Sequence, residues 1–73
     1  MKTPRFMTEY ANCIKRTVQE YASVDSTTKQ LAVDRVDKAV KNYTRGYITL
    51  VEAMDTIGSV LKAVQYYAYG EGE

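Results

Sequence analysis

Apolar residues recur along this chain at spacings of three and four, the period of an α-helix that buries one face. The first such stretch predicts a helix over residues 4–22, with Thr3 as its N-cap and Pro4 in its first turn. Its main apolar stripe consists of Met7, Ala11, Ile14, Val18 and Tyr21, and a second stripe beside it of Phe6, Tyr10, Cys13 and Thr17. This position predicts that the Cys13 thiol is buried and unreactive.

A second helix is predicted over residues 27–45. Small polar residues at 23–26 interrupt the first pattern, and Thr27 and Gln30 have the spacing of a capping box. The apolar stripe that follows is Val33, Val36, Val40, Tyr43 and Tyr47, widened by Ala32 and Ala39. We also expect two acid-before-base ion pairs on the outer face of this helix, Asp34 with Lys38 and Asp37 with Lys41.

A third helix is predicted over residues 49–68. Gly46 can adopt the left-handed conformation that ends a helix, and Thr49 and Glu52 have the spacing of a capping box at the next helix start. The apolar positions keep a heptad: Leu50, Met54, Ile57, Leu61, Val64 and Ala68. Gly58 interrupts the helix interior, and we expect it to permit a close approach of another helix.

These stripes predict one all-α domain over residues 1–69, followed by a flexible acidic tail at 70–73. The simplest arrangement is an antiparallel, up-down-up bundle of the helices. The alternative is a helical hairpin of the second and third helices that dimerises, with the first laid across it. A chain of 73 residues has a thin core, and it has one cysteine and no histidine to supply a disulfide or a zinc site. We therefore expect self-association, with a dimer favoured, to supply the additional stability.

The composition argues against several functional classes. Ten basic residues against nine acidic ones do not suit a dedicated nucleic-acid binder. With no histidine and no glycine-rich phosphate loop, we expect no enzyme, no cofactor and no metal site; Glu52 and Asp55 are interpreted as partners of the helix dipole. No export signal and no apolar run of roughly 20 residues are evident, so we expect a cytoplasmic protein.

Three of the seven tyrosines crowd the end of the third predicted helix and cannot all face one thin core. Tyrosine combines a large apolar ring with a polar tip, and it is a frequent anchor of protein interfaces. Val60 and Tyr67 also form a second apolar row beside the heptad, as at an interface. The predicted partner contacts are Tyr66, Tyr67 and Tyr69 in this region, with Arg45 and Tyr47 at the turn before the third helix.

Basic residues near the end of the second helix support an alternative. Lys38, Lys41 and Arg45 follow one another at spacings of three and four, close to Tyr43 and Tyr47. Cations could contact phosphates while the rings stack on bases. The same cations also stabilise a helix C-terminus, and two aspartates interrupt the stripe.

The segment from Gly46 to Glu52 resembles the turn of SHOCT-type helical hairpins, which are oligomerisation modules. Leu50 and Val51 replace the acidic residues usual there, so the resemblance implies a hairpin and no function. The whole chain is similar in style to small accessory proteins of bacteriophages, which often inhibit a host enzyme or defence complex by occupying a surface. That resemblance implies a viral inhibitor acting in the infected cell.

The leading prediction is a non-enzymatic, self-associating protein that modulates or inhibits a larger protein through a helical, tyrosine-rich face. Two alternatives remain open: an oligomer that sequesters a nucleotide-like ligand, and an accessory factor that binds nucleic acid.

Overall fold

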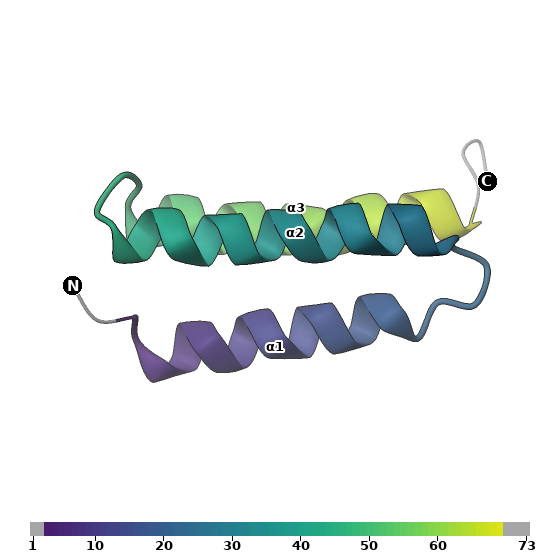
Figure 1. Cartoon of the computed structure of the whole chain (residues 1–73), viewed down its shortest axis with the longest axis horizontal. Coiled ribbons are helices and arrows are strands. Elements are labelled where there is room, and N and C mark those ends of the chain that lie inside the picture. The colour runs from purple at the N-terminus through teal and green to yellow at the C-terminus, as the bar shows by residue number, and fades with distance from the viewer. Residues whose placement is uncertain (1–2, 70–73) are drawn as a thin grey trace.

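A computed structural model describes residues 3–69, which form three helices. They are α1 (Arg5–Gln19), α2 (Ser26–Thr44) and α3 (Leu50–Tyr69). Each helix packs against both others, and they run up, down and up along the long axis of the molecule (Figure 1). The predicted all-α bundle is confirmed. The predicted acidic tail at 70–73 lies outside the described residues.

Within the part of the chain that the structure describes, every buried side chain is apolar. The fully buried stripe of α1 is the predicted one, Met7, Ala11, Ile14 and Val18. The other buried residues are Val24 in the α1–α2 connection, Ala32, Val36 and Ala39 of α2, and Ala53, Ile57, Val60 and Val64 of α3. Alanine recurs on all three helices, and its small side chain lets helix axes approach closely.

The buried face of α3 is rotated from the predicted heptad. Ala53 and Val60 are buried at its centre, whereas Leu50, Met54 and Leu61 are only partly buried at its edge. The heptad assignment favoured the largest side chains, but the closest helix contacts are made by small ones. Val60, predicted to belong to an exposed interface row, is therefore a core residue.

Two predicted helix starts were wrong. α1 begins after Pro4, which has no side-chain cap, and the Thr3 hydroxyl instead contacts the Thr44 hydroxyl at the end of α2. α2 begins at Ser26 because the Asp25 carboxylate accepts a hydrogen bond from the Thr28 backbone N–H at 3.3 Å. Asp25 therefore performs the capping role predicted for the residue two positions later.

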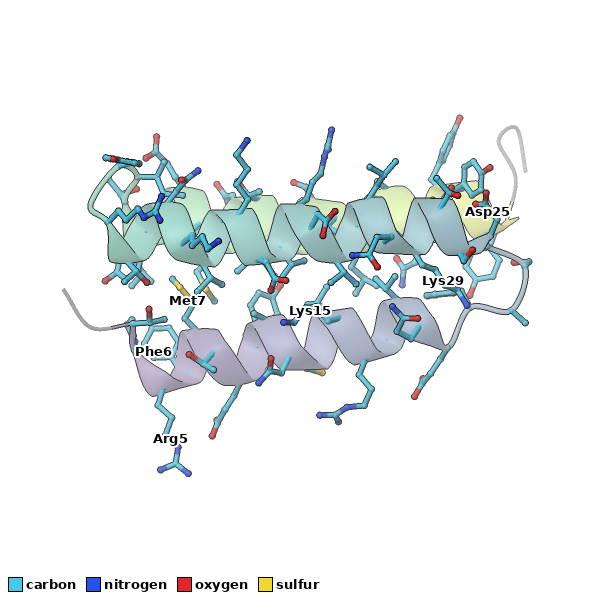
Figure 2. The ribbon with its side chains drawn as sticks, in the orientation of Figure 1. Arg5, Phe6, Met7, Lys15, Asp25 and Lys29 are labelled. Atoms are coloured by element: carbon cyan, nitrogen blue, oxygen red, sulfur yellow. The ribbon has the colours of Figure 1, made fainter. Side chains whose placement is uncertain are left out.

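α1 ends at Gln19, three residues before its predicted end. The Lys29 ammonium of α2 donates a hydrogen bond to the Gln19 carbonyl at 3.0 Å, so a cation satisfies one of the last carbonyls of α1. Figure 2 shows Lys29 beside the end of α1. Tyr21, predicted as the last member of the α1 stripe, lies in the connection and packs against the core.

The α2–α3 hairpin follows the prediction. Gly46 has φ of +83°, and the Tyr47 N–H donates to the Asn42 carbonyl at 2.8 Å, as in a Schellman motif. The Thr49 hydroxyl then accepts from the Glu52 N–H at 3.1 Å, and the Glu52 carboxylate accepts from the Thr49 N–H at 2.8 Å. The capping box at the start of α3 is confirmed.

Two predictions about polar side chains were wrong. Cys13 is exposed, because it lies on the part of α1 that turns away from the core. The expected ion pairs along α2 do not form: Asp37 pairs with Lys15 of α1 at 2.8 Å, and Asp34 accepts a hydrogen bond from Gln30 at 2.9 Å. Lys15, the partner of Asp37, lies between α1 and α2 in Figure 2.

Candidate partner-binding groove

A groove of about 390 Å³ runs between α2 and α3. Its apolar lining consists of Leu31 and Ala32 from α2 and Val60, Ala63, Val64 and Tyr67 from α3. Its charged lining consists of Asp34, Arg35 and Lys38, all from α2. α1 contributes no lining residue, so the groove lies where a fourth helix would complete the bundle.

Small side chains form the floor of this groove, and two large ones form its walls at one end. Ala32, Val60 and Val64 belong to the buried core and close the groove from below. Leu31 is 61% exposed and Tyr67 is 59% exposed, although both are large apolar residues. Leu31 is turned about 100° from its buried neighbour Ala32, which places it on the wall.

The charges begin one helical turn after Leu31, at Asp34 and Arg35, and continue to Lys38 at the other end of the groove. Lys38 lies seven residues after Leu31, a rise of about 10 Å along a helix axis. Because α3 supplies only apolar lining residues, the electrostatic character of the groove comes entirely from α2. The groove is thus apolar near Leu31 and Tyr67 and carries two cations toward the α2–α3 turn.

The three tyrosines predicted as partner contacts do not form one face. Tyr66, Tyr67 and Tyr69 are all exposed, but successive helix positions differ by about 100° in direction. Only Tyr67 lines the groove. The ring of Tyr69 instead meets the ring of Tyr21 edge-on, with centroids 6.0 Å apart and planes at 79°. Hydrogen bonding with Tyr21 raises the pKa of the Tyr69 hydroxyl.

Arg45 and Tyr47, the second predicted partner site, are exposed at the α2–α3 turn. Figure 1 places this turn at the opposite end of the bundle from the end of α3. α3 has 20 residues, which corresponds to about 30 Å. One short partner segment therefore cannot contact both the turn and the C-terminal tyrosines.

Lys38, Lys41 and Arg45, the predicted phosphate contacts, do lie together on the outer face of α2. They surround a shallow depression that also contains Asp34 and Asp37. The interleaved carboxylates oppose phosphate binding, although Asp37 is already paired with a lysine of α1. Tyr43, predicted to stack on bases, packs against the core.

Leu31, Arg35 and Ala63 are groove residues that the sequence analysis missed. Leu31 falls outside every apolar stripe, and that was the available signal: a large aliphatic residue on a predicted outer face has no structural reason to be there. The groove itself depends on how α2 and α3 are rotated toward each other. The heptad assignment did not give that rotation correctly.

In residues 3–69, no group of three or more cysteine and acidic side chains is placed to hold a metal ion. Over the same residues, none of the helices combines the length and the apolar character that a membrane crossing requires. Comparison of the chain with protein-family models, with curated proteins and with solved structures gave no match.

Proposed function

We propose that this chain is a protein-binding module that docks its α2–α3 groove on a segment of a larger protein and so modulates or inhibits it. One observation carries the proposal. Leu31 and Tyr67, at 61% and 59% exposure, stand on either side of a groove that is open to solvent and has an apolar floor. Large exposed apolar residues grouped around a concave surface are typical of an interface.

The energetics suit a modest, reversible complex. Covering a large apolar side chain completely contributes about 1.5–3 kcal/mol. Because Leu31 and Tyr67 are 61% and 59% exposed, covering both supplies about 2–3.5 kcal/mol. This is a quarter to less than half of the roughly 8 kcal/mol of a micromolar complex, before the cost of association is subtracted. The remaining contribution comes from the floor of the groove and from the charged residues of α2.

The chemistry of the lining also favours recognition over reaction. From α2 the groove presents one carboxylate, one guanidinium, one ammonium and one hydroxyl, opposite an α3 wall whose only polar group is the Tyr67 hydroxyl. Such a distribution fixes the orientation of a ligand with a few polar contacts and binds it through apolar area.

Affinity purification from the source cell tests the proposal with matched variants. The groove variant is Leu31→Ser with Tyr67→Ser, and the control is Val51→Ser with Tyr66→Ser, which alters equally exposed residues outside the groove. We expect proteins retained by the wild type and the control to be lost by the groove variant. Their binding to the purified groove variant should weaken about tenfold or more. Equal retention by the groove variant would contradict the proposal.

A nucleotide-like ligand is the second candidate, because the groove brings Tyr67 and two cations together. A base stacked on the Tyr67 ring would place its phosphates toward Arg35 and Lys38. Thermal-shift measurements with nucleotides test this candidate. A stabilisation that Lys38→Ala removes would support it, and the absence of any shift would count against it.

A further inference from the structure

The shape of the groove selects the conformation of its occupant. Its lining runs over about three helical turns of α2, from Thr28 to Lys38, and about two of α3, from Val60 to Tyr67. Both walls are helices, whose backbone groups are bonded internally, so an extended peptide would leave its own N–H and C=O groups unpaired against them. A helix satisfies its backbone itself and places residues i, i+3, i+4 and i+7 in such a groove.

The charges of the groove select the polar residues of that helix. The lining carries two cations, Arg35 and Lys38, against one carboxylate, Asp34, which accepts a hydrogen bond from Gln30 at 2.9 Å, so its net charge is positive. Within residues 3–69, neither Arg35 nor Lys38 forms an ion pair. A partner that covers the groove removes water from these cations, which is unfavourable unless it offers carboxylates in return. The groove therefore favours an occupant with acidic residues facing α2.

A second copy of this chain does not meet that requirement. If two copies met groove to groove about a two-fold axis parallel to the helices, α2 of each copy would face the apolar α3 wall of the other, and its cations would be covered without a carboxylate. If the axis were perpendicular to the helices, the two α2 helices would face each other antiparallel, and Asp34 would face Arg35 but Leu31 would face Lys38. Either arrangement covers Lys38 with apolar side chains.

We infer that the groove binds an amphipathic α-helix of another protein, with acidic residues beside its apolar stripe at the end nearest Arg35 and Lys38. This inference rests on the proposed function and names its partner segment. The helix needs about two turns of contact, with three or four apolar residues between Leu31 and Tyr67 and over the floor. The complex is then a four-helix bundle in which the partner supplies one helix.

A displayed peptide library tests the inference on the full chain. Each peptide is an alanine-rich helix with leucines at i, i+3, i+4 and i+7, and with glutamate, glutamine or lysine varied at the flanking positions. We expect selection to enrich glutamate on one flank, with about fivefold tighter binding than the lysine-flanked equivalent, as two partly exposed ion pairs provide. The preference should weaken as salt is raised.

Charge reversal supplies the matched control. Arg35→Glu with Lys38→Glu should invert the preference toward lysine flanks. Lys41→Glu with Lys62→Glu, which makes the same change in net charge at exposed residues outside the groove, should leave it in favour of glutamate.

The outcomes separate this inference from the proposed function. Peptides could bind through Leu31 and Tyr67 without any preference for glutamate flanks, or with a preference that Arg35→Glu and Lys38→Glu do not change. Either result would contradict the inferred acidic partner helix, but the groove would still be a docking site. A selection that yields no binder would also overturn the inference. Binding that is unaffected by Leu31→Ser with Tyr67→Ser would instead contradict the proposed function.

Discussion

Small residues determine how closely the three helices of this protein approach one another. Alanines occupy buried positions on all of them: Ala11, Ala32, Ala39 and Ala53. Gly58 does not mark such an approach. A Cβ atom there would lie 3.2 Å from the hydroxyl oxygen of Tyr10 on α1, and no backbone atom of another helix lies within 4 Å of it. The expected close approach of another helix at Gly58 was therefore wrong, and the glycine instead accommodates the tip of a side chain.

Gly58→Ala should stabilise the protein by about 0.5–1 kcal/mol. Replacing an interior helical glycine by alanine favours the helix by about 1 kcal/mol, and the half-buried Tyr10 ring needs to move its hydroxyl by only a few tenths of an ångström. Urea denaturation followed by circular dichroism measures the change. Destabilisation that Tyr10→Phe relieves would show instead that the hydroxyl cannot move.

At the residue scale, the sequence predicted burial correctly where the neighbouring residues on the same helix face, three or four positions away in both directions, were also apolar. The α1 stripe is an example, since Met7, Ile14 and Val18 are all buried. Cys13 was misplaced because it was assigned to a second stripe of which Tyr10 packs against the core, whereas Cys13 lies farther around the helix and is exposed. Residue type alone does not set the width of a buried face, because the positions of the neighbouring helices set it.

At the scale of the elements, helix ends depend on which of several competing side chains caps them. Before α2, Asp25 and Thr27 are both suitable N-cap residues, and the structure shows the aspartate in that role. Before α3, Thr49 has no competitor, and the predicted capping box forms. The sequence pattern was sufficient where one candidate was present and insufficient where Asp25, Ser26 and Thr27, all suitable N-cap residues, followed one another.

Alanine substitutions of Thr49 and Thr27 should therefore change the free energy of unfolding by different amounts. Thr49→Ala should destabilise the protein by about 1 kcal/mol, because it removes the hydroxyl that accepts from the Glu52 N–H. Thr27→Ala, at an exposed residue in the first turn of α2, should change the free energy of unfolding by less than about 0.5 kcal/mol. Equal losses in urea denaturation would contradict the assigned cap of α2.

The Asp25 cap predicts a pH dependence of stability. Hydrogen bonding to Thr28 lowers the pKa of the Asp25 carboxyl below its usual value of 3.8. The unfolded chain therefore binds this proton more readily than the folded one, so the contribution of the cap is complete above pH 3.8 and is lost as the pH falls through the lowered pKa.

Asp25→Asn isolates this effect, because asparagine caps a helix equally well and does not titrate. The free energy of unfolding of the wild type should fall relative to that of the variant as the pH is lowered below 3.8. A difference between the two proteins that stays constant from neutral to acidic pH would contradict the assigned role of the carboxylate.

At the scale of the whole molecule, the three apolar stripes and the short α2–α3 turn were enough to predict the antiparallel bundle. The groove was not predictable in the same way, because it depends on the rotation of α2 relative to α3. Val60 is buried while Tyr67, seven residues later on the same side, is exposed. Only the arrangement of the helices shows that Tyr67 stands beside Leu31 over an apolar floor.

The groove also bears on the predicted homodimer. A two-fold contact through the groove would cover Lys38 with apolar side chains, so we expect a dimer to use a different surface. The exposed residues Tyr47 and Val51 near the α2–α3 turn are one such surface. Self-association remains a prediction, and it is separate from the binding of a partner helix.

The most direct test of the groove is an NMR titration of the isotopically labelled chain with the tightest-binding glutamate-flanked helical peptide. We predict that the largest amide shift changes occur at Leu31, Arg35, Ala63 and Tyr67, and that the exposed face of α1 around Cys13 changes little. Largest changes at the α2–α3 turn around Tyr47, or along α1, would contradict binding in the groove.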